Sequence, residues 1–285
     1  MLSLRDAILP VLGVAVLLMA GVFAWVYFTQ ERLIFYPQRL DEGTVRIFQR
    51  SHPSAEPFEL EADGGVRLRG WLVSGQARTA CPLVMYFGGN AEEVSWLVPE
   101  WSRVPGWTLL LVNYRGYGLS DGRPSEPALY RDAVALYDRV TGRADIDTLR
   151  VVVLGRSLGT GVATYLALQR SVAGVVLVSP YDSLVEVARS VYPFLPVERF
   201  LRHRFDSAAR AGLIHAPLLA LVAAQDNLIP PERSQHLVQA WGGPARLELL
   251  DGVDHNNIHL HPRYWALITA FLAERAAARP AASVR

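Results

Sequence analysis

The sequence of 285 residues contains no lysine, and all 28 of its basic residues are arginine. This usage is typical of the codon bias of a GC-rich bacterial genome. The net charge is only +1, which disfavours a nucleic acid partner, because phosphate backbones select strongly basic surfaces. The single cysteine, Cys81, excludes an intrachain disulfide. Internal repeats and low-complexity segments are also absent, so the length predicts one ordinary domain plus an apolar segment.

That apolar segment lacks charge altogether over residues 7–28 and is long enough to span a bilayer. Trp25 and Tyr27 lie near its end, where aromatic rings suit the membrane interface. The sequence therefore predicts an N-terminal transmembrane anchor over residues 1–29 and a catalytic domain over residues 30–285. A cleaved signal peptide, with a site after Ala24, is the alternative, but the apolar run continues beyond that point.

The charges that flank this segment leave its orientation open. Arg5 precedes it, while Arg32 and Arg39 follow it, which would keep the domain in the cytoplasm. A long domain, however, crosses a membrane largely regardless of such charges. We therefore expect a single-pass protein of a bacterial inner membrane, with the side of the catalytic domain undetermined.

A serine turn is the most informative motif. Ser157 lies in Gly155-Arg156-Ser157-Leu158-Gly159, directly after the β-branched run 151–154 and before a predicted helix over 160–170. A strand–G-x-S-x-G–helix pattern predicts a strained turn that exposes the serine hydroxyl, with glycines where a Cβ would collide with the fold. A serine that merely caps the helix is the alternative.

Two further candidates follow later strands in the chain order that this motif requires. Asp226 comes after the predicted strand 217–223, and His255 comes after the predicted strand 245–250. Parallel strands bring the groups at their carboxyl ends to one edge of a sheet. Ser157 would be the nucleophile, His255 its base, and Asp226 the group that orients His255. Asp182 and Asp254 are competing candidates for the acid; we favour Asp226 for its place at a strand end.

An acyl transfer also needs donors for the oxyanion. One is expected to be the backbone N–H of Leu158, the residue after the nucleophile. Glycines let the chain approach a substrate oxygen, so the Gly88-Gly89-Asn90-Ala91 loop after the strand 83–87 predicts the second donor at the N–H of Asn90. An ordinary glycine turn is the alternative for this loop.

These motifs together resemble the α/β-hydrolase superfamily of serine hydrolases, in the branch whose domain follows an N-terminal membrane anchor. The similarity covers about residues 30–275 and implies cleavage of acyl esters or thioesters, including lysophospholipids and palmitoylated proteins. Two positions depart from the branch, which has His-Gly-Asn at Gly88-Gly89-Asn90 and Gly-His at Asp254-His255. The matching segments are Leu33-Ile34-Phe35-Tyr36-Pro37, Gly89-Asn90-Ala91, Asn113-Tyr114-Arg115-Gly116-Tyr117-Gly118, Gly155-Arg156-Ser157-Leu158-Gly159-Thr160 and those around Asp226 and His255.

The remaining pattern alternates strands with helices and predicts an α/β fold, a mostly parallel central sheet with helices on both faces. An antiparallel pair is expected over 58–62 and 66–73, and helices over 91–102 and 126–141. Residues 182–213 are expected to form a short lid in which Pro193 and Pro196 interrupt any long helix. This segment carries a set of large apolar residues, Val191, Tyr192, Phe194, Leu195, Val197 and Phe200. As function, this apolar set would line an acyl pocket or touch lipid; as structure, it would simply pack over the sheet.

A metal site is the other interpretation of the C-terminal histidines. His255, His259 and His261 lie close in sequence, but their spacing across a loop and Pro262 does not converge the rings. We therefore expect neither a metal nor another cofactor.

The predicted function is a membrane-anchored serine hydrolase of esters or thioesters that forms an acyl-enzyme. A peptidase and a non-catalytic tethered interaction module are the alternatives. The expected partners are a small-molecule or lipid acyl substrate and the membrane.

Overall fold

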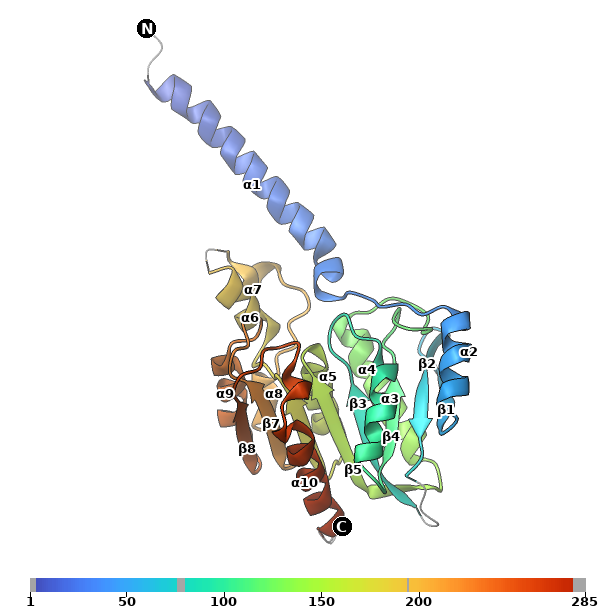
Figure 1. The fold of residues 1–285 in the computed structure, drawn as a ribbon. Coiled ribbons are helices and arrows are strands. Elements are labelled where there is room, and N and C mark those ends of the chain that lie inside the picture. Colours follow the sequence, from blue (N-terminus) through green and yellow to red (C-terminus); the bar gives the residue numbers. More distant parts are fainter. Residues whose placement is uncertain (1–3, 76–79, 194, 279–285) are drawn as a thin grey trace.

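One continuous sheet of eight strands organises the computed structural model, which describes residues 4–75, 80–193 and 195–278 (Figure 1). The strands are β1 Ala55–Ala62, β2 Val66–Val73, β3 Cys81–Phe87, β4 Thr108–Val112, β5 Ile146–Arg156, β6 Gly174–Val178, β7 Leu218–Ala223 and β8 Ala245–Leu250. Their order across the sheet is β1-β2-β4-β3-β5-β6-β7-β8. The pairs β1–β2 and β2–β4 are antiparallel and the other neighbours are parallel, which confirms the predicted, mostly parallel sheet.

Helices cover both faces of this sheet, because its central strands are apolar on both sides. Every residue of β4, β6 and β7 is buried. Side chains alternate between the two faces of a strand, so such runs need a hydrophobic layer on each face. One layer is formed by α4 (Glu126–Thr141), α5 (Leu158–Gln169) and α9 (Pro231–Gln239). The other contains α3 (Leu97–Glu100) and α10 (Arg263–Ala277).

One predicted element is wrong. The single helix expected over 91–102 is instead a 3-10 turn (Val94–Trp96), the short helix α3 and a second 3-10 turn (Trp101–Arg103). Pro99 lies in the middle of the segment and lacks the N–H that a continuous α-helix needs. The indole N–H of Trp101 donates to the carbonyl of Trp107 at 2.9 Å and fixes the turn from its side chain.

Helix α1 (Leu4–Ile34) projects away from the domain (Figure 1). It contains one segment, Ile8–Ile34, that is long and apolar enough to cross a membrane, the only such segment in the described parts of the chain. The helix continues past residue 29, where the anchor was expected to end, and Gln30 is buried against the domain. The division into an anchor and a catalytic domain stays a prediction.

The chain that follows α1 is held against the domain from its first residues. Phe35 is buried, the N–H of Gly118 donates to the carbonyl of Gln38 at 2.7 Å, and the N–H of Leu40 donates to the carbonyl of Gly118 at 3.1 Å. Helix α2 (Glu42–Ser51), which was not expected from the sequence, then packs beside β2, where the ring centroids of Phe48 and Trp71 lie 4.9 Å apart. No flexible linker therefore separates α1 from the sheet.

Residues 182–213, called the lid segment below, contain α6 (Leu184–Val191), α7 (Val197–Phe200) and α8 (Ala208–Ala211). Pro193 and Pro196 lie between α6 and α7, where they prevent one continuous helix. Phe194 lies outside the described residues. Figure 1 places α6 and α7 at the end of the domain from which α1 leaves.

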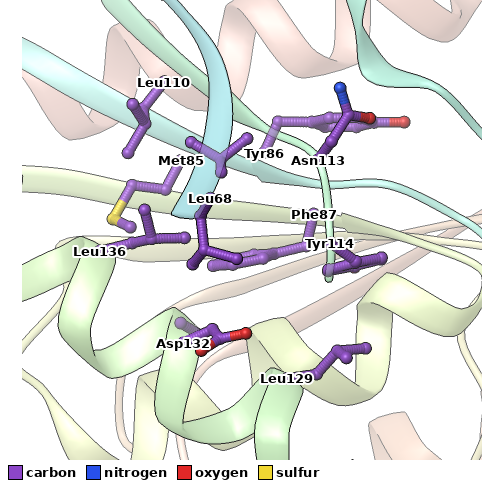
Figure 2. A pocket seen from close by; sticks show the side chains of 12 residues that line it. Leu68, Met85, Tyr86, Phe87, Leu110, Asn113, Tyr114, Leu129, Asp132 and Leu136 are labelled. Atoms are coloured by element: carbon purple, nitrogen blue, oxygen red, sulfur yellow. The ribbon is translucent and has the colours of Figure 1, made fainter. Parts of the chain in front are cut away.

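A small void between the sheet and α4 is part of the core. Leu68, Met85 and Leu136 are among the residues that line it, with Asp132 at one side (Figure 2). Its volume of about 10 Å³ is the room of roughly one water molecule. Asp132 forms a bidentate ion pair with Arg115, with N–O distances of 2.6 and 2.7 Å. A ligand site must therefore lie elsewhere.

Candidate active site

Ser157 occupies a sharp turn between β5 and α5. Its φ of 49° and ψ of −118° are unfavourable for any residue with a Cβ, and they aim the side chain away from the strand. The flanking glycines make the turn possible. A Cβ on Gly155 would lie 2.5 Å from the Gly159 carbonyl oxygen, and a Cβ on Gly159 would lie 2.1 Å from that of Phe87. The strand–turn–helix context expected around Ser157 is present.

Three buried side chains form a hydrogen-bonded series at the carboxyl ends of β5, β7 and β8. The Nε2 of His255 lies 2.9 Å from the Oγ of Ser157, and its Nδ1 lies 2.7 Å from Oδ2 of Asp226. The other carboxylate oxygen of Asp226 accepts from the backbone N–H groups of Leu228 and Ile229 at 3.0 and 2.7 Å. The structure thus brings together all three residues that the sequence singled out.

The charge of Asp226 determines which ring nitrogen of a neutral His255 carries the proton. Burial by itself raises the pKa of Asp226, but the hydrogen bonds from His255, Ile229 and Leu228 outweigh it and hold the pKa below its usual value. An ionised carboxylate only accepts hydrogen bonds, so Nδ1 of a neutral His255 must carry the proton. Nε2 then presents its lone pair to the hydroxyl of Ser157, as a general base requires.

The two competing acids are engaged elsewhere. Asp182 pairs with Arg233 at 3.1 Å and lies 3.4 Å from Nδ1 of His236, both from α9. Asp254 caps its own turn and accepts from the N–H groups of Asn256 and Asn257. Neither has a hydrogen bond to His255 among the described residues.

The C-terminal histidines have separate partners. His259 packs against the ring of Trp96, with centroids 5.6 Å apart, and Nδ1 of His261 accepts from the N–H of Arg263 at 3.1 Å. Within residues 4–75, 80–193 and 195–278, no cluster of histidine, cysteine, aspartate and glutamate side chains could hold a metal ion.

The loop expected to supply the second oxyanion donor lies against the serine. A Cβ on Gly89 would lie 3.4 Å from the Cβ of Ser157. The side-chain oxygen of Asn90 accepts from the N–H groups of Tyr36 and Ala91 at 2.8 and 2.9 Å, and the hydroxyl of Tyr117 donates to it at 3.3 Å. Asn90 therefore braces its own loop and ties it to the chain that follows α1.

A buried ion pair beneath this loop was missed from the sequence. Glu92 accepts from the N–H of Gly89 at 2.6 Å and from Nη1 of Arg156 at 3.1 Å, as well as from Tyr86 and Trp96. Arg156 also donates to the carbonyl of His255 at 3.2 Å. One ion pair therefore links the loop at Gly89, the serine turn and the histidine loop. No local pattern reveals it, because its partners are 64 residues apart.

An apolar cavity of about 280 Å³ opens beside Ser157. Fourteen residues line it and none of them is charged. They come from the end of α1, the loops around the serine, the lid segment and the loop after β7. The lining residues are Leu33, Ile34, Asn90, Ser157, Leu158, Tyr181, Leu184, Val187, Ala188, Val191, Tyr192, Leu201, Leu228 and Ile229.

Comparison with known proteins agrees with this arrangement. Residues 82–209 match the model of the alpha/beta hydrolase fold family. The protein MT2364 of Mycobacterium tuberculosis is 36% identical over 258 residues, which cover 90% of this chain and 91% of that protein. The alpha/beta hydrolase domain-containing protein WAV2 of Arabidopsis thaliana is 30% identical over 240 residues, 77% of each chain. The chain belongs to the α/β-hydrolase family.

Solved α/β-hydrolases are similar in fold but distant in sequence. The acetyl xylan esterase from Paenibacillus sp. R4 superposes with a TM-score of 0.62 and 18% identity, covering 86% of this chain and 98% of that one. A likeness at this identity shows the α/β-hydrolase fold alone. What this α/β-hydrolase acts on must be argued from its own residues.

Proposed function

We propose that the protein is a membrane-anchored serine hydrolase that cleaves carboxylic esters or thioesters through an acyl-enzyme intermediate. The observation that carries the proposal is the buried series Ser157–His255–Asp226, with both hydrogen bonds at 2.9 Å or less. A chain of nucleophile, base and orienting carboxylate is what activates a serine hydroxyl at neutral pH.

In the proposed reaction, Oγ of Ser157 attacks the acyl carbonyl carbon while Nε2 of His255 takes the hydroxyl proton. The developing oxyanion is stabilised by the N–H groups of Asn90 and Leu158, neither of which donates to another group in the described chain. His255 then gives the proton to the leaving oxygen or sulfur, and an acyl ester of Ser157 remains. Water, activated by the same histidine, hydrolyses that ester and restores the serine.

The anchor supports the membrane part of the proposal. The most apolar window of Ile8–Ile34 has none of its length buried in the protein, which disfavours a core helix. Gln30 and Glu31 of the same helix contact the lid segment, so α1 remains continuous with the domain. Cleavage after Ala24 would leave Gln30 and Glu31 in place but would remove Phe23, whose ring stacks on that of Phe200 with centroids 4.9 Å apart, so an uncleaved anchor explains that contact better.

An active-site probe tests the proposal directly. We expect a fluorophosphonate probe to label the full-length protein in detergent micelles and Ser157→Ala to abolish that labelling. Ser51→Ala, at an exposed serine on α2, is the matched control and should label normally. Absence of labelling in a folded protein would refute the enzyme proposal and favour a non-catalytic tethered module. A panel of acyl esters, thioesters and peptides then separates the proposed activity from a peptidase.

A further inference from the structure

The cavity beside Ser157 has the chemistry of a hydrocarbon chain site. Ten of its fourteen lining residues are aliphatic, and its uncharged polar groups include those of Asn90 and Ser157 at the reacting end. A cavity of about 150 Å³ accommodates benzene, so about 280 Å³ accommodates roughly ten carbon atoms. An acyl group fits this cavity, with its carbonyl beside Ser157 and its unbranched alkyl chain against the aliphatic residues.

The mouth of the cavity is itself apolar and faces outward. Leu33 is 60% exposed, Val191 49%, Tyr192 56% and Leu228 54%, and all four line the cavity. They come from three separate segments, the end of α1, the lid segment and the loop after β7. A contiguous apolar rim is unusual on a surface that faces water, and such a rim marks a surface that binds a membrane or another apolar partner.

Contacts between α1 and α7 set the depth of this rim relative to a bilayer. The rings of Phe23 and Phe200 stack with centroids 4.9 Å apart. Phe23 lies inside the uncharged run 7–28, five residues before its end, which is roughly 8 Å along a helix. Phe200 must therefore lie at the level of the lipid chains next to the headgroups, the depth at which interfacial helices bind.

Hydrogen bonds between α1 and the lid segment begin about two turns after Phe23 and fix that register. Nε2 of Gln30 donates to the carbonyl of Phe200 at 3.1 Å, and its Oε1 accepts from the N–H of Arg202 at 2.8 Å. The guanidinium of Arg202 covers the ring of Tyr27 at 5.2 Å and pairs with Glu31 at 3.2 Å. The lid segment thus contacts α1 at the point where its sequence changes from apolar to polar. Phe200 lies against the apolar part of α1, and Arg202 lies against the polar part.

We propose that the Ser157 cavity is a site for one acyl chain of a membrane amphiphile and that its mouth opens into the bilayer interface. The end of α1 forms part of the wall, so the anchor builds the site as well as holding it at the membrane. This inference rests on the proposed function, since the chain must belong to an acyl group that Ser157 attacks.

Insertion of the rim is measured by quenching with lipids. A nitrobenzoxadiazole label is placed at Tyr192→Cys in the full-length protein, with the buried Cys81 replaced by alanine. The matched control is Leu149→Cys, 63% exposed and toward the amino end of β5. In phosphatidylcholine vesicles that contain doxyl-labelled lipid, we expect quenching at position 192 and none at position 149. Equal quenching at both sites, or none at either, overturns the inference.

Chain selectivity is measured with Val191→Arg, which places a charge at the mouth without disturbing a buried side chain. We expect the ratio of kcat/KM for a decanoyl ester to that for an acetyl ester to fall about tenfold or more, the partition free energy of two methylenes. Ala188→Trp, which fills the cavity, should lower the same ratio. Leu149→Arg is the control, at a residue remote from the cavity, and should leave both rates unchanged.

The outcomes separate the inference from the proposed function. If acetyl ester hydrolysis and fluorophosphonate labelling persist while the wild type shows no preference for the longer chain, the chain site is refuted and the serine hydrolase stands. If labelling and acetyl hydrolysis are both absent, the proposed function fails and the inference fails with it.

Discussion

Arg156→Met removes the cation that connects three parts of the site. Arg156 and Glu92 are largely buried, with side-chain exposures of 16% and 6%. Breaking a buried ion pair by removing one partner costs about 3–5 kcal/mol, because the remaining charge stays buried. Glu92 keeps donors from Gly89, Trp96 and Tyr86, so we expect the lower end, about 3 kcal/mol of unfolding free energy.

The same substitution should lower kcat more than it raises KM. The carbonyl of His255 loses the donor that holds its loop, and a misplacement of about 1 Å costs about 10²-fold in rate. Arg156→Lys should recover part of the stability but less of kcat, because one ammonium cannot reproduce the two-sided contact of a guanidinium. Denaturant titrations in micelles and acetyl ester kinetics measure the two effects.

Arg170→Met is the matched control. Arg170 pairs with Asp138 at 2.7 Å, a shorter distance than in the buried pair, but both side chains are substantially exposed. Such surface pairs contribute about 0–1 kcal/mol. If Arg156→Met costs no more than Arg170→Met and leaves kcat unchanged, the idea that this pair positions the site is refuted.

Three further predictions concern single residues. Gly159→Ala should lower the free energy of unfolding by about 3 kcal/mol or more, since its Cβ would lie 2.1 Å from a carbonyl oxygen. Gly142→Ala should be tolerated, because the nearest atom to its Cβ would be 3.5 Å away. Thermal melts compare the two variants. Asp226→Asn should lower kcat about 10⁴-fold by reversing the tautomer of His255, read from ester hydrolysis with the fold checked by circular dichroism; a loss below tenfold would contradict the assigned role. Burial lowers the pKa of His203 against the attraction of Glu31, so below about pH 6.5 the unfolded state binds more protons than the folded state. The free energy of unfolding therefore decreases as the pH is lowered. His203→Gln should weaken that decline between pH 7 and 5 in denaturant titrations, and an unchanged decline would contradict it.

Much of the fold was predictable because its signals are local. The strands before Ser157 and Asp226 contain uninterrupted apolar runs, the strand before His255 alternates leucines with Arg246 and Glu248, and the glycines beside the serine mark a turn that tolerates no Cβ. The helix predicted over 91–102 is wrong because Pro99 and a side-chain contact of Trp101 impose separate turns. Local composition does not record such contacts.

The contacts that complete the site were not predictable, because they join distant segments. Asp182 and Asp226 both follow neighbouring strands, and only the fold shows that Asp182 pairs with Arg233 of α9. Likewise, Gln30 meets the lid segment across 172 residues of sequence, and no periodicity signals that encounter. The sequence therefore pointed to the three side chains that the structure brings together, but not to the ion pairs and helix contacts around them.

The hydrogen bonds of residues 35–40 also determine how the protein encounters its substrate. For a protein anchored as proposed, this short strap leaves the domain no slack to swing into the aqueous phase. Encounters then occur by lateral diffusion in two dimensions. Turnover should follow the mole fraction of substrate in the membrane surface, and adding empty vesicles should slow it even when the bulk concentration is constant.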